Sequence, residues 1–225
     1  IGMSIYYSLL RWDGIGKAQF KGLSNYLVVL SESDFLQILG NAFQLVVYFT
    51  VIPVAIGLGV ASAIRNHLGG RFGATARTIL FIPQVIPLVA AGIAWSWMLA
   101  SNGVVNQALS LIGLGGITRG WLGDFDFALP AVGLIGAWVL LGLCTMLLVT
   151  GIARIDPSLY EAGKIDGASA WDEFRWITLP GLRQEIGVCV TVTVIAALAS
   201  FDIVYIATGG GPGIQTTVPG LEIYR

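Results

Sequence analysis

The sequence predicts an all-α integral membrane protein, a polytopic helical bundle with four complete spans, the tail of a first span and a final span missing. Its 225 residues are 56% apolar and only 11% charged, and the mean hydropathy is +0.81. An average soluble domain carries about 25% charged residues. Four apolar segments are long enough to cross a bilayer, since about 20 helical residues span its core of roughly 30 Å. They are residues 41–64, 78–99, 128–152 and 186–208.

The two ends of the chain look like parts of further spans. Residues 1–10, I-G-M-S-I-Y-Y-S-L-L, are apolar, but as a helix they would cover only about 15 Å. We interpret them as the tail of a first span whose beginning is absent. No cleavage site precedes them, so no signal peptide is predicted. The chain stops at E-I-Y-R, where a final helix is expected to begin, so we expect a fragment lacking parts of both ends.

Prolines and glycines modify the predicted spans. Pro83 and Pro87 each remove a backbone donor from residues 78–99 and should bend that span. A packing kink and a functional hinge are equally compatible with this pair. Small residues let helices approach closely, and the spans at 41–64 and 128–152 contain Gly57, Gly59, Gly133 and Gly136.

The distribution of Lys and Arg predicts the orientation of the spans, since cytoplasmic loops carry an excess of both. The loops on one side contain Arg65, Arg71, Arg77, Arg154, Lys164, Arg175 and Arg183. The opposite side has fewer, namely Arg11, Lys17, Lys21, Arg119 and Arg225. Residues 153–185 are therefore expected inside the cell. No internal repeat or linker divides the sequence, so we expect one transmembrane domain over residues 1–225.

Several function classes are disfavoured by the composition. The formal net charge is −1 and no basic run occurs, which argues against nucleic-acid binding. Cys144 and Cys189 lie in apolar runs without metal-ligand spacing, so neither a metal site nor a disulfide is predicted. His67, the only histidine, is expected in a short polar connection without a chemical role. Paired carboxylates, HExxH and a nucleophile with a neighbouring histidine are absent, which disfavours a membrane-embedded hydrolase, and no cofactor is expected.

The polar stretch between the third and fourth complete spans predicts two short helices. Asp156 and Pro157 suit the cap and the first position of a helix over S-L-Y-E-A-G-K-I-D. Gly167 suits the left-handed residue that ends it. Ser169 and Asp172 then resemble a capping box. The second helix carries the bulky side chains Trp171, Phe174 and Trp176 before it ends at residues 177–180.

This helix, turn and helix would suit a docking element. Ala162 and Gly163 give the first helix a flat patch beside the charged Glu161, where another protein could approach the backbone. From the residues alone, two interfacial helices that merely cap the bundle are equally compatible.

The same stretch resembles the cytoplasmic EAA loop of permease subunits in binding-protein-dependent ABC importers. The pattern of that loop is EAA, three residues, G, nine residues, I, one residue, LP. The matching positions here are Glu161, Ala162, Gly163, Gly167, Ile177, Leu179 and Pro180. Gly163 replaces the usual Ala, which weakens a helix by about 1 kcal/mol but keeps the surface flat.

Further motifs narrow the resemblance to the sugar-type permeases. These are R-W-D-G at 11–14, F-K-G-L-S-N-Y at 20–26, L-F-I-P at 80–83, W-L-G-D at 121–124 and T-G-G-G-P-G at 208–213. The resemblance implies a multi-pass protein of the prokaryotic inner membrane that imports mono- or oligosaccharides or polyol phosphates. Its partners would be a second homologous permease subunit, cytoplasmic ATP-binding subunits and an extracytoplasmic solute-binding protein.

By the same resemblance, Glu161 pairs with a basic residue in a groove of the ATPase, and Gly167 shapes the turn of the inserted loop. The sequence contains no G-x-x-x-x-G-K-[ST] phosphate loop. ATP hydrolysis is therefore expected in a partner subunit, and this chain is not expected to be an enzyme.

Candidates for a sugar pathway come from aromatic and polar side chains within the spans, because aromatic faces stack on sugar rings and polar side chains inside a membrane usually face a cavity. They are Trp138, Tyr48, Gln44 and Asp202, with Trp138 near the midplane and Asp202 about 24 Å along its span. Trp95 and Trp97 fit an interfacial belt better. The main alternative is an ion-coupled secondary transporter, although apart from Asp202 the spans offer no ionisable relay.

Overall fold

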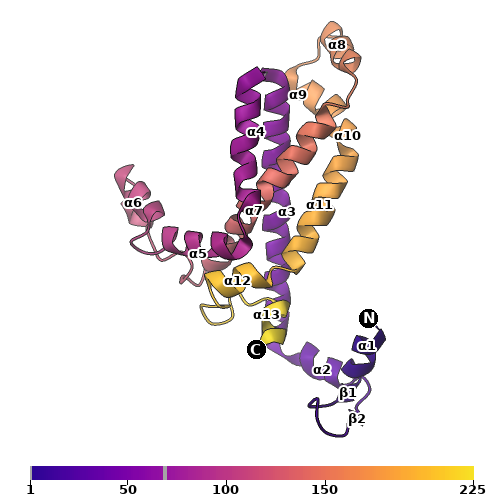
Figure 1. Ribbon diagram of the computed structural model, residues 1–225, viewed down its shortest axis with the longest axis vertical. Coiled ribbons are helices and arrows are strands. Elements are labelled where there is room, and N and C mark those ends of the chain that lie inside the picture. The colour runs from indigo at the N-terminus through magenta and orange to yellow at the C-terminus, as the bar shows by residue number, and fades with distance from the viewer. Residues whose placement is uncertain (1, 68–69) are drawn as a thin grey trace.

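The computed structural model describes residues 2–67 and 70–225, and for residues 66, 67, 70–74, 76 and 77 it describes the backbone alone. Helices dominate the described chain (Figure 1). The five longest are α3 (Ser33–His67), α4 (Gly70–Val85), α5 (Leu88–Met98), α7 (Ala128–Ile152) and α11 (Arg183–Leu198). Helix α3 thus extends through His67, which was expected in a loop.

Shorter elements connect and extend these helices. Before α3 lie α1 (Gly2–Ser8), the antiparallel pair β1 (Leu10–Arg11) and β2 (Gln19–Phe20), and α2 (Ser24–Ser31). Between α5 and α7 lie α6 (Val104–Leu111) and the 3-10 turn η1 (Gly115–Ile117). After α7 come α8 (Pro157–Ile165), α9 (Ala170–Glu173), the π-helical turn η2 (Phe174–Thr178) and α10 (Leu179–Gly181). The chain ends with α12 (Phe201–Ala207) and α13 (Pro219–Tyr224).

The long helices form a bundle whose two ends differ. The end of α3, the start of α4, the end of α7 and the start of α11 gather where α8 and α9 lie (Figure 1). We call this the loop end. The opposite end, the far end, carries α5, α6, α12 and α13, and the N-terminal elements lie beyond it (Figure 1).

Two of the predicted spans are continuous helices. The span predicted at 128–152 coincides with α7, and the span at 41–64 lies inside α3. Among the described residues, Ser33–Arg65 and Ala128–Ile152 are the two helices long and apolar enough to cross a membrane. Two bent pairs raise this number to four if each pair forms one span: Thr78–Val85 with Leu88–Met98, and Ala170–Gly181 with Arg183–Leu198.

The other two predicted spans are broken, and for residues 186–208 this corrects the expectation of one continuous helix. Residues 78–99 bend by 104° between Val85 and Leu88, because Pro87 has no backbone N–H and disfavours helical geometry at the preceding residue. The bend predicted from the prolines is therefore confirmed. The helix in residues 186–208 stops at Leu198 and restarts as α12 at Phe201. Neither proline nor glycine marks this second break.

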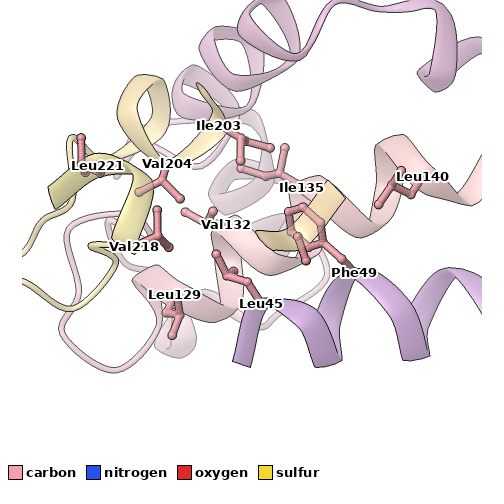
Figure 2. Packing of buried hydrophobic residues seen from close by; sticks show 11 residues of the cluster. Leu45, Phe49, Leu129, Val132, Ile135, Leu140, Ile203, Val204, Val218 and Leu221 are labelled. Carbon is pink, nitrogen blue, oxygen red and sulfur yellow. The ribbon is translucent and has the colours of Figure 1, made fainter. Parts of the chain in front are cut away.

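Helix α7 is the centre of the bundle. Of its most apolar stretch 67% is buried, against 33% for α3, so α3 keeps one side exposed. Figure 2 shows the core at the far end, where Leu45 and Phe49 of α3 meet Val132 and Ile135 of α7 beside Ile203 of α12. A second cluster at the loop end joins α3, α7 and α11 and includes both cysteines, which are free thiols.

Close packing of α3 on α7 depends on glycines, as the sequence suggests. A Cβ at Gly133 would overlap the side chain of Tyr48, and a Cβ at Gly136 would overlap the Phe49 ring. By contrast, nothing lies within 4 Å of a Cβ placed at Gly59. The three glycines therefore differ in what they contribute, although their residue type is the same.

We predict that Gly136→Ala lowers the free energy of unfolding by about 1–3 kcal/mol, because it overpacks the contact with Phe49. Gly59→Ala is the matched control, and it should be neutral or stabilising by up to about 1 kcal/mol, the difference in helix propensity. Thermal unfolding of the detergent-purified protein, followed by tryptophan fluorescence, measures both. Equal unfolding midpoints for the two variants would contradict the packing shown here.

Candidate functional site

Residues 156–182, which we call the loop unit, begin with a capped helix. The carboxylate Oδ1 of Asp156 accepts a hydrogen bond of 2.9 Å from the N–H of Ser158, and Pro157 occupies the first position of α8. This hydrogen bond stabilises the charged form of the carboxylate, so the pKa of Asp156 lies below its usual value. The cap predicted from the sequence is therefore confirmed.

A tight turn at Gly167 ends α8. Gly167 has a φ of +80°, a region that disfavours residues with a Cβ. Its N–H donates to the carbonyl of Lys164 at 3.2 Å, and the N–H of Ala168 donates to the carbonyl of Gly163 at 2.9 Å. This pair of bonds is a Schellman motif, and it satisfies carbonyls that a helix end would otherwise leave without donors.

The second helix starts with the predicted capping box. The N–H of Ser169 donates to Asp172 Oδ2 at 3.0 Å, and the N–H of Asp172 donates to Ser169 Oγ at 3.3 Å. Hydrogen bonds from Ser169, the side chain first, lower the pKa of Asp172. Local sequence therefore specifies both helix starts and the turn between them.

Helix α9 continues into the π-helical turn, where the N–H of Leu179 donates to the carbonyl of Phe174. Pro180, one residue later, has no N–H to offer, and π-helical turns are frequent at functional sites. A Cβ at Gly163 would lie 3.3 Å from Cδ1 of Ile177. The motif residues Gly163 and Ile177 therefore pack against each other across the turn.

One face of α8 is left uncovered. Glu161, Ala162 and Ile165 share this face at helical spacing and are exposed, with Ile165 at 87%, whereas Tyr160 on the opposite face is buried. Trp171 on α9 is also exposed, at 65%. Among the described residues, Glu161 takes part in no ion pair. Large exposed apolar side chains around an unpaired charge are typical of a protein-binding surface.

An anchor that the sequence analysis missed attaches the loop unit to α3. Arg65 donates from Nη2 to Glu173 Oε2 at 2.9 Å, and its Cζ lies 3.3 Å from the ring centroid of Tyr160. The hydroxyl of Tyr160 shares a hydrogen bond of 3.1 Å with Thr178 Oγ1. In the sequence Arg65 is recognisable only as a positive loop charge, because nothing local connects positions 65 and 173. The side chains of Arg71 and Arg77 lie outside the described part of the structure.

A cavity of about 360 Å³ lies where the two broken helices meet. It is lined by residues on both sides of the breaks and on α3 and α7: Phe49, Gln84, Ile86, Leu88, Gly136, Val139, Leu140, Ala196, Ala199, Ser200, Asp202 and Ile203. Gln84 Oε1 and Ser200 Oγ are buried and accept or donate no hydrogen bond within the described chain. Buried polar groups of this kind usually have a partner, and with Asp202 these two residues are the polar ones in an otherwise apolar lining.

The predicted pathway residues are distributed differently around this cavity. Asp202 lines it, in the first turn of α12. The placement of Asp202 about 24 Å along one straight span was wrong, because the helix breaks before it. Tyr48 packs against Gly133, Trp138 makes an edge-to-face contact with Trp95 at 5.4 Å, and Gln44 is exposed. None of these three lines the cavity.

The two tryptophans expected in an interfacial belt also differ from each other. Trp97 is 75% exposed. Trp95 packs against the core at the far end, in agreement with its contact to Trp138. Its ring is therefore part of the packing between α5 and α7.

Comparison with known proteins decides the family. Residues 55–225 match the family described as binding-protein-dependent transport system inner membrane component. The chain belongs to this family. The probable ABC transporter permease protein YurN of Bacillus subtilis is 32% identical over 99% of this chain and 77% of the relative. The trehalose/maltose transport system permease protein MalF of Thermococcus litoralis is 36% identical over 90% of this chain and 68% of its own length.

Solved structures agree with the fold. A bacterial ABC transporter involved in the import of alginate aligns with a TM-score of 0.77 at 22% identity, over 100% of this permease and 77% of that chain. The resemblance stated from the EAA motif is thus confirmed, and this permease is a multi-pass membrane protein. Family membership favours the ABC permease over the ion-coupled transporter that the composition left open.

We predict opposite effects for two glycine substitutions in the loop unit. Gly163→Ala should stabilise α8 by up to about 1 kcal/mol, because only the flexible end of Ile177 must shift. Gly167→Ala should destabilise the turn by about 1–2 kcal/mol, since φ is positive there. Amide hydrogen exchange of residues 157–166 measures both changes. Slower exchange in Gly167→Ala than in Gly163→Ala would contradict the assigned turn.

Proposed function

We propose that this permease is the transmembrane subunit of an ATP-driven importer for carbohydrates: mono- or oligosaccharides or polyol phosphates. Cytoplasmic ATP-binding subunits hydrolyse ATP, and this chain changes its conformation in response. A second homologous permease subunit completes the membrane pathway, and an extracytoplasmic solute-binding protein delivers the sugar. Residues 1–225 form one transmembrane domain of the prokaryotic inner membrane, and the loop unit faces the cytoplasm.

The observation that carries the proposal is the uncovered face of the loop unit. Both of its helices are capped by their own residues, so the unit holds its shape without a covering partner. Glu161 stands on that face beside the exposed Ala162 and Ile165. A charged group beside a flat patch would fit a complementary groove that carries a basic residue, and the motif match assigns that groove to the ATPase. Gly167, Leu179 and Pro180 determine the backbone course of the unit. Ile177 packs against Gly163 of α8.

The carbohydrate class is supported by named relatives and by the cavity. Besides the trehalose/maltose permease, the lactose transport system permease protein LacF of Rhizobium radiobacter is 33% identical over the whole chain and 78% of its own length. A sugar presents many hydroxyls and an apolar ring face. Gln84, Ser200 and Asp202 line the cavity beside Phe49, which suits both features.

We predict that Glu161→Lys leaves the subunit inserted in the membrane but uncouples transport from ATP hydrolysis. Reversing a desolvated interfacial charge costs about 2–5 kcal/mol of binding, so the ATPase subunits should dissociate. Sugar uptake and co-purification of the ATPase, measured on the complete transporter in vesicles, test this. Glu32→Lys changes an exposed carboxylate near the far end and serves as the control. Undiminished uptake by Glu161→Lys would contradict the proposal.

We predict that Ser200→Ala and Asp202→Asn each reduce the maximal rate of sugar uptake about tenfold, the effect of losing about 1.4 kcal/mol of a polar contact. Trp138→Ala and Tyr48→Ala complete the series proposed for the pathway. Thr191→Ala is the control, because Thr191 is exposed on α11 outside the cavity. Radiolabelled sugar uptake measures all five variants, and normal uptake by both Ser200→Ala and Asp202→Asn would exclude this cavity.

A further inference from the structure

The anchor between α3 and the loop unit joins charges that are otherwise expensive to bury. Glu173 is buried, with 9% of its side chain exposed, and the Arg65 side chain is 21% exposed. Burying a carboxylate costs considerable free energy unless it is paired and hydrogen-bonded. Arg65 supplies that partner at 2.9 Å. This buried ion pair differs from the pair of Arg154 and Glu185, in which the Arg154 side chain is 80% exposed.

Arg65 makes its contacts with both helices of the loop unit at once. Its guanidinium lies over the ring of Tyr160 on α8 while it pairs with Glu173 on α9. A planar guanidinium can stack on a ring and donate from its edge at the same time, whereas a lysine ammonium is a point charge. Tyr160 immediately precedes Glu161. The anchor thus reaches within one residue of the charge that is proposed to meet the ATPase.

The middle of α3 reaches the cavity. Phe49, which lines the cavity, lies 16 positions before Arg65, a helical distance of about 24 Å. Between them α3 is one helix, which includes Pro53, and it packs on α7. A displacement of α8 and α9 therefore acts directly on the helix that forms one wall of the cavity.

We propose that Arg65 is a positioning residue for energy coupling: it fixes α8 and α9 to the end of α3, so that movement of the loop unit moves the cavity wall. This inference rests on the proposed function and adds a residue outside the EAA motif. Arg65 makes no contact with ATP, sugar or the ATPase in this role. It sets how much sugar is moved for each ATP hydrolysed.

The test uses the complete transporter in vesicles, with its ATPase subunits, its second permease and its binding protein. Sugar uptake and ATP hydrolysis are measured together, which gives the ratio of sugar moved to ATP hydrolysed. Arg65→Lys keeps the charge and loses the stacked, two-sided contact. We expect this ratio to fall about fivefold or more, while the ATPase subunits and the sugar concentration for half-maximal uptake stay unchanged.

Two further variants separate coupling from simple destabilisation. Glu173→Gln should lower the ratio as Arg65→Lys does, and the double variant should be no worse than either, because both remove one shared interaction. Arg154→Lys, at the exposed pair of the same end, should keep the wild-type ratio. If Arg65→Lys does not accumulate in the membrane, Tyr160→Leu takes its place, since it removes the ring and retains the ion pair.

A wild-type ratio in Arg65→Lys, or in Tyr160→Leu where it replaces that variant, would overturn the inference. So would defects that add up independently in the double variant, or loss of the ATPase subunits, which would make Arg65 part of docking. These outcomes differ from failure of the proposed function. If the proposed function failed, the wild-type transporter itself would show no ATP-dependent sugar uptake.

Discussion

Hydrocarbon offers no hydrogen-bond partner, so a chain that crosses it must satisfy its backbone internally or break its helices where protein surrounds them. Helices α3 and α7 follow the first course and run without interruption. The helices around Pro87 and Ser200 follow the second, and both breaks border the same cavity beside α7. The constraint thus concentrates irregular backbone and buried oxygens at one place in the bundle, beside the cavity that we propose for the sugar.

The loop unit differs, because caps formed by its own residues start its two helices, while Tyr160, Glu173 and Leu182 are buried against the rest of the bundle. Asp156, Ser169 and Gly167 fix two helix starts and one turn through bonds within a few residues. The ATPase can bind such a unit and displace it as one rigid body. Its buried attachment through Arg65 and Glu173 then determines which membrane helix follows the displacement.

The sequence predicted those features whose causes are local. The limits of α7, the caps, the turn at Gly167 and the bend near Pro87 all follow from residues close together in the chain. The break at Ser200 has no such local mark, so residues 186–208 were mistaken for one helix and Asp202 was misplaced. The pairing of Arg65 with Glu173 joins positions that only the folded bundle brings together. The cavity likewise combines residues of α3, α4, α5, α7, α11 and α12, and no single stretch encodes it.

Coupling to a cytoplasmic ATPase depends most directly on the side of the membrane from which Glu161 can be reached. A cysteine at position 161 can be labelled with a membrane-impermeant maleimide, since the native Cys144 and Cys189 are buried. In vesicles of opposite orientation, we expect labelling from the cytoplasmic side alone, and protection from labelling when the ATPase subunits are bound. Labelling from the outer side would contradict the account, because no cytoplasmic ATPase would then reach the loop unit.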